Sequence, residues 1–130
     1  MSSPNYVSLF NKHFVEFLSD VELVFPEDVD IKTAKNSVIF LQKNNPSLLI
    51  KLWKKHVMDK YQEEIEKGNI QFFIEKDYYK DIEKSGNSQQ INEIIERLRD
   101  PISCMSEENK NKTIKYIQNL SKLANIYFSN

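Results

Sequence analysis

Histidine and cysteine, the side chains that most often bind transition metals or act as a general base or a nucleophile, are few in this chain: there are two histidines and one cysteine. His13 and Glu16 are three residues apart, so on a helix they would share one face. Di-iron helical bundles use such pairs, but in the order Glu-x-x-His and on two helices, whereas this chain has one pair in the opposite order. Zinc would need more cysteine and histidine ligands. We therefore predict no metal site and no cofactor, with His13 and His56 both partly exposed.

Cys104 lies in the stretch DPISCMSEEN, which places no base beside the thiol. A nucleophilic cysteine needs such a base, and a buried cysteine that only packs is the commoner case, so we expect Cys104 to be buried. The chain has no glycine-rich loop that could cradle a phosphate. The sequence thus predicts a protein that is not an enzyme, with no catalytic residue and no evident small-molecule substrate. A single cysteine also excludes a disulfide within the chain and favours a reducing, intracellular compartment.

Charged residues alternate in sign along the chain in four blocks. Residues 1–30 have one lysine and six acids, 31–60 have seven lysines and one acid, 61–108 have six basic and twelve acidic residues, and 109–130 have four lysines and no acid. The basic block 31–60 could contact nucleic-acid phosphates or an acidic partner, with these candidates: Lys51, Lys54, Lys55 and Lys60. Two other interpretations stay open, namely neutralisation between neighbouring helices and self-association of an acidic face with a basic one.

The stretch NNPSLLIKLWKKHV, residues 44–57, carries three of these lysines and the only tryptophan. Leu49, Trp53 and Val57 recur every four residues, which predicts one buried line on a helix with the lysines turned toward water. A tryptophan at this spacing usually belongs to the core, but an exposed aromatic ring would be an interface anchor. The candidate anchors, if exposed, are Trp53, Phe72 and Tyr79.

The elements that must position these residues are predicted to be helices, because two glycines and four prolines are too few for a sandwich or barrel. Apolar residues recur at three- and four-residue spacing in six stretches. These begin at Ser3–Pro4, Asp30, Asn45–Pro46, Asn69, Asn87 or Ser88, and Ser106; Asp100–Pro101 is expected to start a short extra piece. The third helix is expected to end at Gly68 and could break near Asp59.

Two details of this pattern bear on packing. In the second helix Ile39 and Phe40 widen the apolar side, which predicts that this helix is buried on more than one side. The segment IQFFI, residues 70–74, could form a strand, but no partner strand is evident elsewhere. We therefore predict a single all-α domain over residues 1–130, an irregular bundle of about six helices. No stretch approaches the roughly eighteen consecutive apolar residues of a membrane span.

Three stretches together resemble a family of short helical proteins of large nucleocytoplasmic DNA viruses, of the mimivirus and algal-virus kind. They are FNKHFVEFLSDVELVFPEDVDIKTAKNSV (10–38), NPSLLIKLWKKHVMDKYQEEIEKGNIQFFIEKDY (45–78) and ENKNKTIKYIQNLSKLANIY (108–127). The resemblance implies a viral protein of the host cytoplasm, the virus factory or the virion. It implies no activity and no site residue.

These observations favour a non-enzymatic helical protein that acts as a structural or interaction protein. The block charges and the aromatic content of 12% point to a protein partner, which could be a second copy of the chain. The alternative is a nucleic-acid accessory protein that uses the basic residues 31–60.

Overall fold

The computed structural model describes residues 5–84 and 86–129, and all regular structure in these ranges is helical. The all-α prediction is confirmed, and the segment IQFFI lies in a helix. The elements in chain order are α1 (Tyr6–Val24), α2 (Val29–Asn44), α3 (Leu48–Trp53), the π-helical turn η1 (Lys54–Met58), α4 (Asp59–Lys67), α5 (Ile70–Glu75), α6 (Tyr79–Ile82), α7 (Ser88–Ser103) and α8 (Glu107–Ser129).

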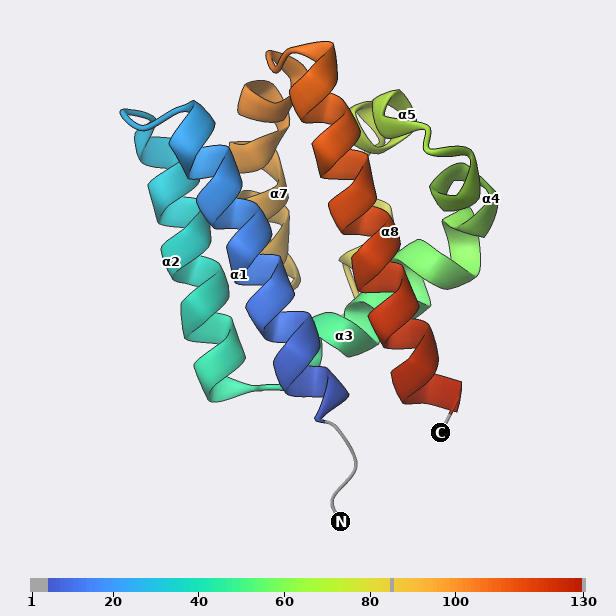
Figure 1. Ribbon diagram of the computed structural model, residues 1–130. Helices are drawn as coiled ribbons and strands as arrows, with labels where there is room; N and C mark the ends of the chain where they lie inside the picture. The colour runs from blue at the N-terminus through green and yellow to red at the C-terminus, as the bar shows by residue number, and fades with distance from the viewer. Residues whose placement is uncertain (1–4, 85, 130) are drawn as a thin grey trace.

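The four long helices α1, α2, α7 and α8 form a bundle in which successive members alternate in direction (Figure 1). Helix α1 packs against both α2 and α8, and α2 packs against α7. The short helices from α3 to α6 cross the base of the bundle and rise along the side of α7 and α8 (Figure 1). None of the helices in the described residues is long and apolar enough to cross a membrane.

Side-chain caps begin several helices where the sequence places a capping residue. Asn5 accepts a hydrogen bond from the amide of Ser8, and Asn69 accepts one from the amide of Phe72. The predicted start at Ser3–Pro4 lies outside the described residues. The prediction that Asp30 caps the second helix is wrong, because Asp28 two residues earlier accepts from the amides of Asp30 and Ile31.

Two interruptions differ from the predicted helices. The helix predicted from Asn45–Pro46 to Gly68 does break, first at the π-helical turn η1 and again at Tyr61, whose backbone is not helical. The predicted start at Asp100–Pro101 is wrong, because α7 runs through Pro101 to Ser103. The proline ring is buried there and the amide of Cys104 still donates to the carbonyl of Asp100, so one lost hydrogen bond does not end the helix.

Within the part of the chain that the structure describes, the hydrophobic core consists of two clusters rather than one. The first joins α1, α2 and α7 and includes Leu18, Ile31 and Leu98. The second joins α1, α3, η1, α4 and α8 and includes Phe10 and Leu120. Partly buried side chains such as Phe14 and Leu49 pack against both clusters.

Candidate functional site

The two histidines and the cysteine, which could bind a metal ion or act in catalysis, differ in burial and in their neighbours. His13 on α1 is partly buried, with Nδ1 3.5 Å from Oε2 of Glu16 and its ring centroid 4.8 Å from that of Tyr116. His56 on η1 is buried, which corrects the prediction of partial exposure. Cys104 is exposed at the end of α7, which corrects the prediction of burial. Within residues 5–84 and 86–129, no cluster of three or more His, Cys, Asp or Glu side chains could hold a metal ion.

Burial lowers the pKa of His56 below its ordinary value of 6.5, and the positive charges of Lys60 and Lys55 lower it further, while Asp81 acts weakly in the opposite direction. Below pH 6.5 the unfolded chain therefore binds a proton at this residue more readily than the folded chain does. We expect stability to fall as pH is lowered through 6.5, and His56→Gln to flatten this part of the profile. Melting temperatures of both proteins between pH 7.5 and pH 5 measure this dependence. The same loss of stability with falling pH in His56→Gln as in the wild-type chain would contradict the role of His56.

The four candidate lysines divide into two pairs. Lys54 forms an ion pair with Asp59, and Nζ of Lys60 lies 3.0 Å from Oδ1 of Asp81. Lys51 on α3 and Lys55 on η1 are exposed. Two of the four positive charges are thus offset by acidic side chains of the same chain, which weakens the basic face expected for nucleic-acid binding.

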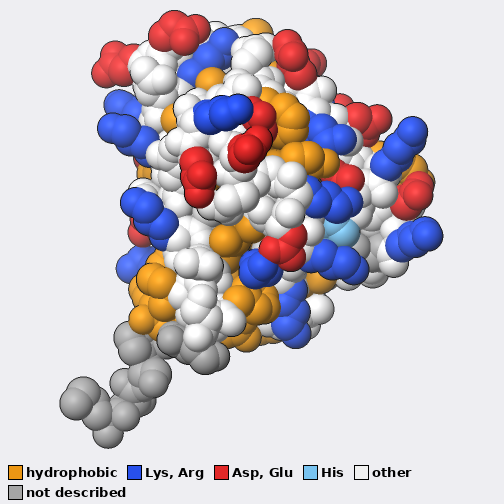
Figure 2. Space-filling model, turned by 90° about the vertical axis from the view of Figure 1, so that its right-hand side faces the viewer, with side chains coloured by type: hydrophobic (Ala, Val, Ile, Leu, Met, Phe, Trp, Pro, Cys, Tyr) orange, Lys and Arg blue, Asp and Glu red, His pale blue; other side chains and the backbone are white. Residues whose placement is uncertain are grey.

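Ion pairs also join the charge blocks to one another. Lys35 of the basic block lies 3.1 Å from Glu22 of the acidic one before it, and Lys60 reaches Asp81 in the acidic block that follows. Figure 2 shows side chains of both signs interspersed on the face at the right of Figure 1, with hydrophobic side chains among them and near the end where α1 begins. These contacts agree with charge neutralisation between neighbouring helices, one of the three interpretations that the sequence left open.

The three candidate anchors differ in exposure. Trp53 is partly buried; its ring packs against Phe10, and its indole N–H donates to Oγ of Ser121 at 3.0 Å. Phe72 is partly buried, with its ring 5.1 Å from that of Tyr61. Tyr79 is the one of the three that is exposed. Trp53 therefore packs against the second core cluster, but it is only partly buried where the four-residue spacing predicted burial.

Two apolar side chains of α2 are more exposed than that of Tyr79. Val29 is 71% exposed and Phe40 is 60% exposed. They are eleven residues apart, which is close to three helical turns, so both point to the same side. The uncharged residues Thr33 and Asn36 lie between them and, with Phe40, line a groove against α7. We call this strip, Val29–Thr33–Asn36–Phe40, the α2 strip.

The α2 strip was only half predicted. The sequence pointed to a second apolar front at Ile39 and Phe40, and we expected the fold to bury it. Ile39 is partly buried, but Phe40 is exposed because none of the described helices packs over it. The eleven-residue spacing of Val29 and Phe40 was the signal that could have identified the strip.

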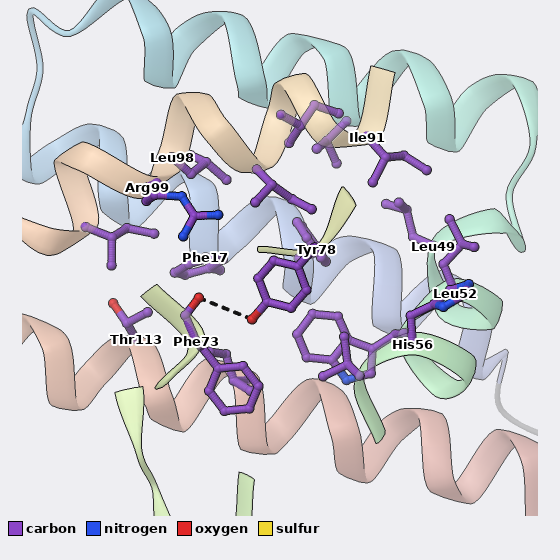
Figure 3. A pocket seen from close by; sticks show the side chains of 18 of the residues that line it. Phe17, Leu49, Leu52, His56, Phe73, Tyr78, Ile91, Leu98, Arg99 and Thr113 are labelled. Atoms are coloured by element: carbon purple, nitrogen blue, oxygen red, sulfur yellow. Dashed lines mark hydrogen bonds between the residues drawn. The ribbon is translucent and has the colours of Figure 1, made fainter. Parts of the chain in front are cut away.

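A cavity of about 220 Å³ lies between the two core clusters, lined by residues of every helix except α4 (Figure 3). Its lining is almost entirely aliphatic and aromatic, as at Phe17, Leu49, Phe73 and Ile94. The sequence does not predict this cavity, because its volume depends on how far apart the helices lie.

Polar side chains at the cavity already have partners. The hydroxyl of Tyr78 donates to the carbonyl oxygen of Phe73, the dashed line in Figure 3. The guanidinium of Arg99 donates to the carbonyl oxygens of Ile74 and Lys76 and lies 3.1 Å from a carboxylate oxygen of Glu96. Burial raises the pKa of Tyr78, so the phenol is neutral at physiological pH.

Comparison of the chain with protein-family models, with curated proteins and with solved structures gave no match.

Proposed function

We propose that the protein is a non-enzymatic helical protein that acts by self-association through the α2 strip, in the particle or factory of a large DNA virus. The observation that carries this proposal is the pair of highly exposed apolar side chains, Val29 and Phe40, which lie at nearly the same angle around α2. Two exposed lysines, Lys32 and Lys43, stand beside the strip. Exposed apolar surface of this kind is typical of an interaction site.

A second copy of the chain fits the α2 strip because the strip is symmetric about its middle. One apolar residue stands near each end, and the two small polar residues Thr33 and Asn36 lie between them. If two α2 helices pack antiparallel, Val29 of each copy meets Phe40 of the other. Such a contact is related by a twofold axis and closes on itself, which is the commonest form of homodimer.

Phe40→Glu tests the proposal directly. We expect the wild-type chain to sediment as a dimer, with twice the monomer mass of 15.4 kDa. The variant should weaken association by about 100-fold or more, because the dimer loses two apolar contacts and gains two buried charges. Analytical ultracentrifugation over a range of concentrations measures this change.

The matched control is Leu9→Glu, which places the same charge on a 44% exposed leucine of α1. This variant should associate as the wild type does. A wild-type chain that is monomeric at every concentration would contradict the proposal, as would a Phe40→Glu variant that remains dimeric.

A second candidate function is nucleic-acid binding as an accessory protein. It is favoured by Lys51 and Lys55, whose side chains are exposed. Two lysines would neutralise about two phosphates, so the logarithm of the affinity should fall with the logarithm of salt concentration with a slope of about −2. Lys51→Glu/Lys55→Glu should abolish binding, measured by fluorescence anisotropy with a labelled duplex. No binding by the wild-type chain at low salt would exclude this function.

A further inference from the structure

The central cavity is an apolar space within the bundle that is partly open to solvent. Every residue that lines it is buried or partly buried, and it separates the two core clusters. We propose that this cavity is a binding site for one small, neutral, apolar molecule, of the size of a substituted benzene ring or a short alkyl chain. This binding would be independent of self-association, since neither Val29 nor Phe40 lines the cavity.

The volume sets the size of the ligand. An engineered cavity of about 150 Å³, lined by leucine, isoleucine and phenylalanine, stays dry and binds benzene. The cavity here has the same type of lining and a volume of about 220 Å³. It can therefore hold a benzene ring with a short substituent, and it is smaller than the roughly 300–1,000 Å³ of pockets for larger ligands.

The polar groups at the cavity determine the charge of the ligand. Arg99 is the one cationic side chain of the lining that is charged at every physiological pH, and its guanidinium is held by two carbonyl oxygens and by the carboxylate of Glu96. An anionic ligand would have to displace that carboxylate. The hydroxyls of Tyr78 and Thr113 donate to the carbonyl oxygens of Phe73 and Asn109. A ligand without charge or hydrogen-bonding groups leaves all these contacts intact.

Polar groups at the cavity are few and lie apart from one another. Figure 3 shows Arg99 and Thr113 toward one end of the cavity, His56 toward the other, and Tyr78 between them with its hydroxyl turned to the carbonyl oxygen of Phe73. The rest of the lining is aliphatic or aromatic. An apolar ligand in this space would contact both core clusters and fill the volume that the side chains leave open.

Trp53 supplies a built-in reporter, because the only tryptophan of the chain lines the cavity. Bromobenzene, which quenches indole fluorescence on contact, should reduce the emission of Trp53 along a saturable, one-site curve. Ethylbenzene should raise the melting temperature of the wild-type chain. Phenylacetate, which has a similar shape and a negative charge, should bind at least tenfold more weakly than ethylbenzene.

Val57→Phe tests the location, because Val57 lines the cavity and the larger ring would occupy part of it. Ethylbenzene should bind this variant at least tenfold more weakly than wild type. Val24→Phe makes the same change on α1 away from the cavity and should bind normally. If Val57→Phe does not fold, Ile95→Phe, also in the lining, replaces it.

Three results would overturn the proposal. The first is quenching of Trp53 that rises linearly with bromobenzene, which indicates random collisions. The second is phenylacetate binding as tightly as ethylbenzene, which indicates an anion site. The third is undiminished ethylbenzene binding by a folded variant with the cavity filled, which places the ligand elsewhere.

Discussion

Replacing Phe10 by alanine is expected to lower the free energy of unfolding by about 3–5 kcal/mol, the range for removal of a buried aromatic ring. Phe10 has no exposed surface, and its ring centroid lies 6.2 Å from that of Phe14 and 6.0 Å from that of Trp53. The substitution would remove the ring that joins α1 to the second core cluster. Urea unfolding followed by circular dichroism, at one fixed protein concentration, measures the loss.

The neighbouring residue gives the control for this change. Leu9 is 44% exposed, since its side chain points about 100° away from that of Phe10 around α1, and Leu9→Ala should change the free energy of unfolding by only about 0.5 kcal/mol. Equal losses of unfolding free energy in the two variants would mean that α1 does not bury the face that carries Phe10.

Replacing Arg99 by alanine is expected to cost about 2–3 kcal/mol of folding free energy. Its guanidinium donates to the carbonyl oxygens of Ile74 and Lys76, which end α5 and begin the link to α6. A hydrogen bond from a charged group contributes about 1.5–3 kcal/mol, and its removal leaves these carbonyls without this donor. Hydrogen exchange should also show faster opening of α5 and α6, because both helices are short.

The chain's other arginine is the matched control. Arg97 pairs with Asp30 on the surface, and an exposed ion pair contributes about 0–1 kcal/mol. Arg97→Ala should therefore leave α5 and α6 protected and change stability little. If Arg97→Ala were as destabilising as Arg99→Ala, the hydrogen bonds of Arg99 would not specifically stabilise α5 and α6.

Much of the fold could be predicted from the sequence, because helix periodicity and capping are local. The three- and four-residue spacing of apolar side chains identified the long helices, and Gly68, with φ at 69°, ends α4 as predicted. Local signals also misled. Asp–Pro at 100–101 has the form of a helix start, yet burial of the proline ring within the bundle keeps α7 continuous.

The candidate sites were predicted less well, because they depend on which helices lie side by side. Burial of His56 and exposure of Cys104 follow from the path of the chain around η1 and after α7, which no spacing rule gives. Lys54 and Lys60 could be recognised as basic residues, but their acidic partners become neighbours only in the folded chain. The cavity exists because the side chains do not fill all the space between the packed helices. Neither that space nor the way the side chains fill it can be read from the sequence alone.

The central claim is that two copies of α2 pack antiparallel through the α2 strip. Single cysteines placed in a Cys104→Ser background test it most directly. Asn36 lies near the middle of the strip, so two copies of Asn36→Cys should form an intermolecular disulfide rapidly under mild oxidation. Val29→Cys lies at one end and should form none with itself. A rapid disulfide at position 29 with none at position 36, or none at either position, would contradict the antiparallel pairing.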